Sequence, residues 1–420
     1  MAATCMKYLR IALFVFVSAL GIARAQEERA APPTEIPDFS NLDEFTYETK
    51  STVTLGFRHL SGAKTSFSGR GKVAGVEDPG PVTGANLARD YHNGKIQPDA
   101  RTTSRLDSSG NLATDPDTGK QVFDPIAPDG KTNTWSYSDA RQLTPDGFVA
   151  FRTYSADIID TDIRKGAAAS TNGMELVVMR DMGNLFGTGL AWNLTAGMSV
   201  NDISSQRSDK VRATLTTLTD MYSLFGQTPP AAPYGSPSST TVPMLDAAGN
   251  SAVDDAGVAK TVSTDATVLI GNQPAGRNIL TTTDTTSVSN HWKLKGAYFT
   301  FRAGPTVWVP ITSRFRASFS LGLALVHAGT NYTVTESFTP EIGSEITETN
   351  SSAASKFLPG YYADATLQFD LTERAGFYAG AIFQSAGSYD QELVSDNAHY
   401  STKVDLANQN GLRAGMTIRF

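Results

Sequence analysis

The amino-acid sequence predicts an all-β fold: a closed, antiparallel, up-and-down barrel of eight strands that crosses a membrane and has long extracellular loops. Three observations predict it. Eight segments alternate apolar and polar residues with a period of two, which matches the two faces of a strand. The connections between them alternate between short and long, as in a barrel with tight turns at one rim. No segment approaches the about 18 consecutive apolar residues of a membrane-spanning helix.

Residues 1–25 have the pattern of a signal peptide. Lys7 and Arg10 precede the apolar segment 11–22, and the Ala-Arg-Ala sequence at 23–25 fits a small-x-small cleavage site. The apolar segment has 12 residues, fewer than the ~20 that a transmembrane helix needs. We therefore expect an exported chain whose first 25 residues are removed.

The composition excludes some classes of function. The 420 residues include 35 Lys and Arg against 42 Asp and Glu, a net charge of −7. Removal of residues 1–25 deletes three basic residues and no acidic one, which leaves about −10. Such a chain, without a basic stretch, is not expected to bind nucleic acid. The only cysteine, Cys5, lies in the signal peptide, so the mature chain is expected to have no disulfide.

Residues 26–46 are rich in proline and acidic residues and predict a flexible periplasmic leader, after which the barrel domain occupies 47–420. The clearest strand pattern lies at 315–326, where Phe315 and every second residue after it are apolar. A helix would instead show a period of 3.6 residues. The eight alternating segments are 50–60, 174–181, 190–200, 297–309, 315–326, 361–371, 376–384 and 411–420.

The connections fall into two classes. Short ones at 182–187, 310–314 and 372–375 are predicted periplasmic turns. The long ones are the predicted outer loops, the two largest at 61–170 and 203–289, with others at 331–356 and near 389–402.

Two further segments have strand-like sequences inside the large loops. Residues 209–224 are assigned to a hairpin that continues beyond the membrane and pairs near 278–289. Segment 147–158 leaves a ten-stranded barrel open as an alternative, if it also spans the membrane.

The composition of the two strand faces indicates which one meets lipid. The polar faces carry mostly small residues, which suits the narrow interior of an eight-stranded barrel. The bulky apolar faces are therefore predicted to contact lipid. Charged residues on the interior faces must be paired with opposite charges. The predicted lumen residues are Arg58, Glu175, Arg302, Arg316, Asp364, Asp370 and Arg413.

The chain ends on a strand pattern, with apolar Met416, Ile418 and Phe420 at alternate positions. This ending resembles the insertion signal of Gram-negative outer-membrane β-barrels, and segments 50–60 and 171–420 resemble small OmpA/OmpX-type barrels in pattern. The resemblance implies an outer-membrane location and recognition of the terminal strand by the barrel-assembly machinery. It also implies lipopolysaccharide and other outer-membrane lipid as partners. Because the last strand pattern reaches residue 420, we expect no C-terminal peptidoglycan-binding domain like that of full-length OmpA-like proteins.

Catalytic and metal-binding patterns are weak. The five histidines are scattered, and none has the spacing of a metal-ligand pair. The segments 107–111 and 246–250 share an Asp-x-x-Gly-Asn pattern that could supply oxygen ligands for calcium, but the closing Glu of an EF-type loop is absent. The same residues favour β-turns, which we expect here. We predict no catalytic residues, no metal and no cofactor.

Three functions follow, in order of preference. The first is a structural or surface-interaction role, with any recognition in the long outer loops and an extracellular partner that the sequence does not specify. The second is a porin-like pore for small solutes. The third is a lipid A-modifying hydrolase or acyltransferase that uses His59 or His327, which lie on the predicted lipid-facing phase at outer strand ends.

Overall fold

The computed structural model describes residues 50–420, except 77, 167–168, 189, 246–249 and 255–256. The predicted signal peptide, the leader at 26–46 and Cys5 lie outside the described residues. The described chain is all-β, with two short 3₁₀ helices, η3 (Ala140–Gln142) and η4 (Leu185–Gly187).

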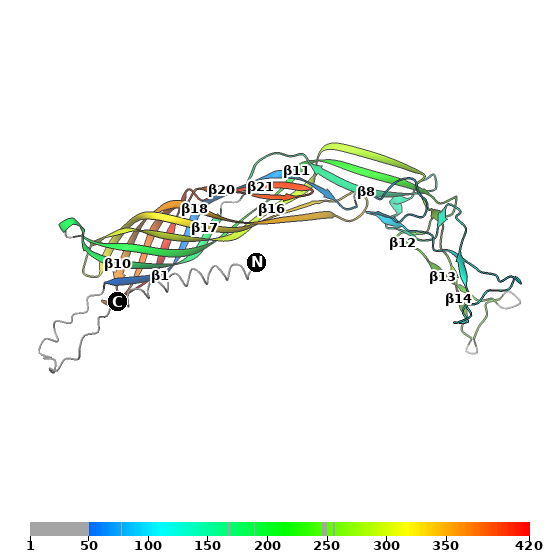
Figure 1. The fold of residues 1–420 in the computed structure, drawn as a ribbon, viewed down its shortest axis with the longest axis horizontal. Helices are drawn as coiled ribbons and strands as arrows, with labels where there is room; N and C mark the ends of the chain where they lie inside the picture. Colours follow the sequence, from blue (N-terminus) through cyan, green and yellow to red (C-terminus); the bar gives the residue numbers. More distant parts are fainter. Residues whose placement is uncertain (1–49, 77, 167–168, 189, 246–249, 255–256) are drawn as a thin grey trace. The chain divides into compact units, whose positions relative to one another are not determined.

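Eight long strands form a closed, hydrogen-bonded ring, and every pair of neighbours in it is antiparallel (Figure 1). The ring closes because β1 pairs with β10 on one side and with β22 on the other. In order around it, the strands are β1 (Ser51–Ala74), β10 (Ala169–Asn184), β11 (Ala191–Ser223), β16 (Gly276–Pro310), β17 (Phe315–Phe338), β18 (Ile346–Asp370), β19 (Ala375–Ser385) and β22 (Gln409–Arg419).

All eight predicted strand segments lie in these strands to within one residue at either end, and the predicted short connections are confirmed as turns, whose described residues are 185–188 and 190, 311–314, and 371–374. The chain terminus takes part in closure. Ser51 and Phe420 exchange both backbone hydrogen bonds, at 3.0 and 2.9 Å, directly beyond the β1–β22 ladder.

The strands are longer than the alternation predicts, so the loop boundaries expected at 61–170, 203–289 and 331–356 need correction. The β17–β18 ladder continues to the pair Phe338–Ile346, which reduces the last of these loops to a turn. The physical reason is that outward side chains beyond residue 327 of β17 are polar. Beyond that point the two faces no longer alternate clearly between apolar and polar residues, although the backbone hydrogen bonds continue.

The expected hairpin beyond the ring is confirmed, since Lys210 to Met221 of β11 pair with Gly276 to Ser289 of β16. The segment considered as an additional membrane strand forms β8 (Phe148–Ile158). One edge of β8 pairs with the distal part of β11 and the other with the end of β1, so β8 lies between two ring strands only in their distal extension and is not a ninth member of the ring.

The long connections contain several shorter strands. The β20–β21 hairpin pairs with the distal part of β1, and β2, β3, β7 and β12 form a separate four-stranded sheet. The shorter strands are β2 (Arg89–Tyr91), β3 (Gly94–Ile96), β4 (Thr102–Ser104), β5 (Phe123–Pro125), β6 (Lys131–Thr132), β7 (Trp135–Tyr137), β9 (Arg164–Lys165), β12 (Tyr234–Gly235), β13 (Ser239–Pro243), β14 (Thr261–Asp265), β15 (Ile270–Gly271), β20 (Ser388–Ser395) and β21 (Ala398–Asp405).

Two large apolar cores hold these parts. One lies within the distal extension of the ring strands, where Phe67 stacks on Trp292 and Tyr332 with ring centroids 6.4 and 5.8 Å apart. The other lies in the loops of segments 75–166 and 224–275, here called the loop module. It packs Trp135 and Tyr137 with side chains of β8 and β11, such as Phe151 and Tyr222. The large loops are therefore folded against their own core.

Candidate functional site

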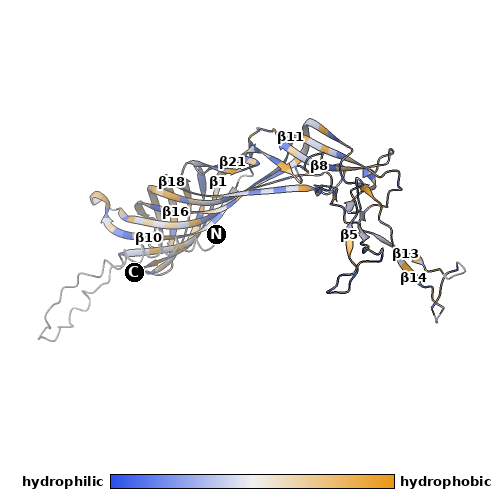
Figure 2. Ribbon diagram, turned by 45° about the vertical axis from the view of Figure 1, so that its right-hand side comes forward, coloured by the Kyte–Doolittle hydropathy of each residue, from blue (hydrophilic) through white to orange (hydrophobic). Residues whose placement is uncertain are grey.

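The outside of the ring carries an apolar band. Along β17, Phe319, Leu321 and Leu323 are exposed, Leu323 by 77%, whereas the intervening Ser318 and Ser320 are buried. Hydrophobic and hydrophilic residues are interspersed along the other ring strands as well (Figure 2). From Phe315 to Leu325 the strand rises about 34 Å, or roughly 26 Å along the ring axis at a tilt near 40°. This height matches the about 25 Å apolar band of an outer-membrane barrel.

The two rims of the band differ in chemistry. At the short-turn rim, aromatic rings gather, among them Phe315 and Phe369 with centroids 4.9 Å apart. At the opposite edge, outward polar groups bridge neighbouring strands: His59 Nδ1 lies 2.8 Å from Asn172 Oδ1, and the backbone N–H of Asn172 donates to Asp202 Oδ1 at 2.7 Å. Outer-membrane barrels carry aromatic residues at both edges of the apolar band, and Phe357 beside His327 supplies an aromatic ring at this edge as well.

Four charged side chains form a closed set of ion pairs inside the ring. Arg302 of β16 contacts Glu175 of β10 at 3.2 Å and Asp364 of β18 at 3.1 Å. Arg413 of β22 contacts the same two carboxylates at 2.7 and 2.9 Å. Each acid therefore lies between two guanidinium groups, and all four side chains are buried. Because an unpaired buried charge is costly, this alternation allows the charges to occupy the interior.

Arg58 of β1 lies next to this ionic cluster and is held by neutral oxygens. Its Nη1 donates to Ser199 Oγ at 2.5 Å and its Nη2 to Gln384 Oε1 at 2.7 Å. Gln384 Nε2 donates in turn to Thr300 Oγ1 at 3.2 Å. Tyr378 adds a hydrogen bond of 2.9 Å to Glu175. The interior thus contains two neighbouring polar networks, which join opposite walls of the ring.

The other two predicted lumen residues, Arg316 and Asp370, lie apart from this cluster at the short-turn rim. Arg316 Nε is 3.2 Å from Asp370 Oδ2, and its guanidinium covers the Trp308 ring at 4.6 Å. Asp370 also binds Arg419, the last residue but one. The structure therefore brings five of the seven predicted residues together and places these two in a partly exposed pair.

The interior is filled rather than open. Between the ionic cluster and the short-turn rim, Thr306 Oγ1 lies 2.6 Å from Thr195 Oγ1 and 2.7 Å from Ser320 Oγ. A cavity of about 20 Å³ is lined by these residues and by Asp364 and Arg413, which is space for roughly one water molecule. On the other side of the cluster the interior continues into the apolar core around Phe67.

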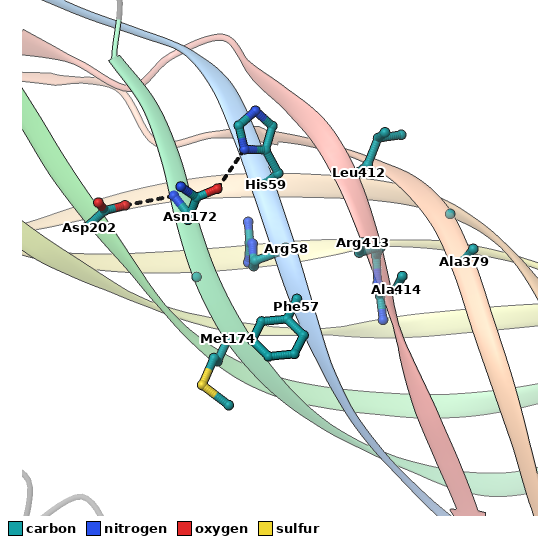
Figure 3. A pocket seen from close by; sticks show the side chains of 12 residues that line it. Phe57, Arg58, His59, Asn172, Met174, Asp202, Ala379, Leu412, Arg413 and Ala414 are labelled. Carbon is teal, nitrogen blue, oxygen red and sulfur yellow. Dashed lines mark hydrogen bonds between the residues drawn. The ribbon is translucent and has the colours of Figure 1, made fainter.

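A groove of about 930 Å³ lies on the outward surface of β1, β10, β19 and β22 (Figure 3). Its apolar side chains Phe57, Met174 and Leu412 are exposed, and Ala379 and Ala414 form part of its lining. The polar series of His59, Asn172 and Asp202 borders it. The groove opens to the outside of the ring. The guanidinium groups of Arg58 and Arg413, which also belong to its lining residues, point away from it and are bonded inside the ring.

The histidines do not converge. His59 and His327 lie at the polar edge of the band, on strands that continue beyond it rather than at strand ends as expected. His327 Nε2 is 2.7 Å from Ser355 Oγ of β18, and its ring lies near Phe357, with centroids 4.4 Å apart. The other three histidines are His92, His291 and His399.

The turn reading of the first Asp-x-x-Gly-Asn segment is confirmed. Asp107 Oδ1 accepts the backbone amides of Ser109 and Asn111, and Asp115 Oδ1 accepts those of Asp117 and Thr118. These carboxylates stabilise turns. Residues 246–249 of the second segment lie outside the described residues. Within the described part of the chain, no group of three His, Cys, Asp or Glu residues is arranged to hold a metal ion.

The sequence did not indicate a buried acid in the distal extension. Glu336 of β17 accepts a hydrogen bond from Tyr400 of β21 and is fully buried. Burial raises its pKa to about 7, with a smaller contribution from Glu348. Only the alternation of β17, continued to residue 336, could have predicted that Glu336 points inward. Because we expected a loop at 331–356, that alternation was not extended to it.

A second polar network lies at the loop module. Asp220 of β11 binds Arg277 at 2.7 Å and accepts a hydrogen bond from Tyr91 at 2.6 Å. The Tyr91 hydroxyl lies 2.8 Å from that of Tyr222, whose pKa burial raises to about 12. This network joins the loop module to the two longest ring strands.

None of the described helices is long and apolar enough to cross a membrane. No protein-family model matches the chain, and no curated protein matches it.

Several solved structures are similar to it. The outer-membrane protease OmpT from Escherichia coli is 10% identical over 88% of this chain and 97% of its own, with a TM-score of 0.27. Ail, the attachment invasion locus protein of Yersinia pestis, is 8% identical over 88% and 99%, with a TM-score of 0.20. A FadL homologue of Pseudomonas aeruginosa is 7% identical over 88% and 90%, with a TM-score of 0.16. These neighbours are outer-membrane β-barrel proteins, but TM-scores this low determine neither fold nor function.

Proposed function

We propose that this chain is an integral outer-membrane β-barrel protein with a structural or surface-interaction role. The observation that carries the proposal is the closed eight-stranded ring, apolar outside over the height of a bilayer and charged inside. A water-soluble protein would not expose side chains such as Leu323 and Phe57 in a continuous band. A closed ring also leaves no unpaired strand edge in lipid, where each unsatisfied backbone group costs several kcal/mol.

A passive pore is disfavoured by the filled interior. The ionic cluster of Glu175, Arg302, Asp364 and Arg413 spans the ring, and the cavity beside it holds about one water. The proposed role therefore belongs to the parts beyond the membrane. Loops on a rigid scaffold are the usual place for recognition, and the loop module has its own packed core.

The loop module also carries side chains suited to contact with a partner. In the turn-rich segment 105–122, Leu106 and Leu112 are more than half exposed, as is Phe123 at the start of β5. Arg105 is paired with Asp124 on the same ribbon. Exposed apolar residues next to charged ones are typical of a protein interaction surface.

Two measurements test this function. The band predicts that the protein fractionates with outer membranes, needs detergent for extraction and migrates differently on gels before and after heating. Protease treatment of intact cells is expected to cleave the loop module and leave the strands of the ring protected. Recovery as a dissolved periplasmic protein without detergent would refute the proposal.

A second candidate function is ester hydrolysis at the membrane surface, which one observation favours. His327 Nε2 lies 2.7 Å from Ser355 Oγ at the edge of the apolar band, within reach for a base that activates a hydroxyl. If this pair is catalytic, expression of the chain changes the mass of lipid A, and Ser355→Ala abolishes the change. An unchanged lipid A mass on expression would reject this function and leave the first one intact.

A further inference from the structure

The distal part of β16 has a free edge. From Gly276 to Val288 one edge of the strand lies against β11, and among the described residues no strand pairs with the other edge before Ser289, where the ladder with β17 begins. The far edge of β11 is covered by β8, so β8, β11 and β16 lie side by side in this order (Figure 1). Every second residue of a ladder directs its N–H and C=O away from its partner strand. This margin of the sheet therefore offers a row of unpaired backbone groups.

The side chains along this edge are uncovered on both faces of the sheet. All six residues from 278 to 283 are exposed, Ile279 by 59% and Leu280 by 61%. Because consecutive side chains of a strand point to opposite faces, each face presents one of these two aliphatic groups. The apolar cores of the distal extension and of the loop module include none of the six residues.

The edge lacks the features that usually prevent pairing with another chain. Proteins protect free edges with charged side chains, proline or a bulge. Residues 278–283 contain no charged residue and no proline, and residues 278–282 keep a regular register with β11, from Asn278 opposite Thr219 to Thr282 opposite Leu215. Four of these six residues are β-branched, as favours strand pairing. The segment is therefore prepared to accept one more strand.

We propose that this free edge of β16 pairs with the same edge of a second copy of the chain. The inference rests on the proposed surface-interaction role and names the partner. Self-pairing opposes an edge to itself, so a charged edge would bring like charges together. Residues 278–283 are uncharged in a chain whose net charge is −7, so this is a part of the surface where two copies can approach with little repulsion. Ladder formation satisfies the free N–H and C=O groups of both copies and covers the exposed aliphatic side chains.

Symmetry restricts the geometry of such a pair. A two-fold axis perpendicular to the strands relates identical edges in antiparallel orientation. Residues that direct their backbone groups to the partner must be opposed by residues of the same phase. One residue then lies directly opposite its own copy, and the middle of the exposed segment makes this residue Leu280 or Thr281. With Leu280 at the axis, Ile279 faces Thr281 of the second copy; with Thr281 at the axis, Leu280 faces Thr282 of the second copy.

The first experiment measures the mass of the full mature chain in detergent by sedimentation, from about 1 to about 300 μM, since an edge of this length makes a small and weak interface. Antiparallel pairing reverses one copy relative to the other, so each copy is supplied in its own micelle. The variant is Leu280→Lys with Thr282→Lys, which opposes like charges in either register. The matched control, Thr335→Lys with Ser337→Lys, adds the same charge to β17, where that strand is paired on both edges.

Wild-type protein is expected to form dimers as its concentration rises. The Leu280/Thr282 variant is expected to dimerise at least about tenfold more weakly, and the control to differ from wild type by less than about twofold. Heat-modifiable gel migration checks that all three proteins are folded. Folded wild-type protein that stays monomeric over the whole range, or a lysine variant that dimerises as well as the control, would overturn the inference.

The second experiment uses single cysteines, because the mature chain is expected to have none of its own. Opposed residues of an antiparallel ladder have Cα atoms about 4.5–5.5 Å apart, which a disulfide can bridge. Mild oxidation is expected to cross-link two copies through Leu280→Cys or Thr281→Cys at least about fivefold faster than through the exposed control Thr347→Cys. Equal rates at all three positions would refute pairing through this edge. Protein that inserts into membranes but fails both experiments leaves the proposed function intact, whereas protein that does not insert refutes that function.

Discussion

At the scale of single residues, the ring interior shows how a narrow lumen accommodates charge. Glu175 and Asp364 are each shared by Arg302 and Arg413, so every carboxylate has two cationic neighbours. Aromatic rings cover the guanidinium groups, with Arg302 over Tyr362 at 5.0 Å. Such a set is sensitive to the loss of one member, because the partner charges remain buried.

Replacing Glu175 with Gln is therefore expected to destabilise the ring by about 3–5 kcal/mol, since Arg302 and Arg413 would then share one carboxylate. The temperature at which the folded gel form converts to the unfolded form measures this. Arg105→Ala, which breaks an exposed pair in the loop module, is the control and should leave that temperature unchanged. A fully stable Glu175→Gln protein would show that the cluster adds nothing to stability.

Glu336 predicts a pH dependence in the distal extension. Its pKa is raised from an ordinary 4.5 to about 7, so the folded state binds a proton more tightly than the unfolded state. Local stability is then greatest below pH 4.5 and falls as the pH rises towards about 7, by at most roughly 3 kcal/mol. Tyr400 and Tyr332 border the carboxyl, and Glu348 adds a repulsive charge.

Hydrogen exchange of amides in β17 and β21, corrected for intrinsic rates, measures this change between about pH 5 and about pH 8. Protection is expected to be lower at the higher pH in the wild type, and Glu336→Gln is expected to remove the difference. Equal protection at both pH values in the wild-type protein would contradict the prediction.

At the scale of elements, each ring strand has two segments with different surroundings. On β17 the outward residues change from Leu325 to His327, Gly329 and Asn331, while the inward residues stay buried to Phe338. One strand therefore runs from the apolar band into the exposed extension without a break in its hydrogen-bond ladder. Under the proposed function, the change in outward chemistry marks the edge of the bilayer.

Leu323→Arg places a charge near the middle of the apolar band, where Leu323 is 77% exposed. The expected cost is about 2–4 kcal/mol when the exposed side faces lipid. Thermal conversion of the folded gel form measures it, with Thr347→Arg, an exposed outward position on β18 beyond the band, as the control. A Leu323→Arg protein as stable as the control would mean that this face does not contact lipid.

The last strand predicts an assembly defect. Phe420 exchanges two backbone hydrogen bonds with Ser51, and its side chain is half exposed at the aromatic rim. Deleting it removes both bonds at the point of closure, together with the terminal aromatic residue proposed to be read during insertion. The amount of membrane-inserted protein is expected to fall severalfold, while Phe420→Tyr stays near wild type. Wild-type insertion after the deletion would reject this role.

At the scale of the whole molecule, the described chain combines a sealed ring with a folded loop module. The polar network of Asp220, Arg277 and Tyr91 lies where the loop module meets β11 and β16. Because β8 pairs with the same part of β11, the loop module is connected to the ring by continuous strands rather than by a linker. The loop module is thereby held on a rigid base, as the proposed surface-interaction role requires.

The sealed lumen predicts an absence of steady conductance in planar bilayers. The filled interior around Thr306 and Arg413 has space for about one water, too little for hydrated ions. A double substitution of Glu175 and Arg302 with alanine is likewise expected to give no steady current, because Asp364, Arg413 and the apolar core around Phe67 still fill the interior. A large, steady current through wild-type protein would refute the sealed-lumen interpretation.

The sequence by itself determined the ring strands, their facing and the charges directed inward. This was possible because the strand period of two separates apolar outward residues such as Leu323 from small inward residues such as Ser320. Around Asn331 the outward residues are polar too, so the two faces no longer differ in residue type and the strand ends could not be predicted.

Only the tertiary structure decided which charges meet. Arg302 and Glu175 are far apart in the chain, and the register of intervening strands sets their distance. The same holds for the loop module core and for Glu336 beside Tyr400, where long-range packing brings together residues whose local sequence shows no shared pattern.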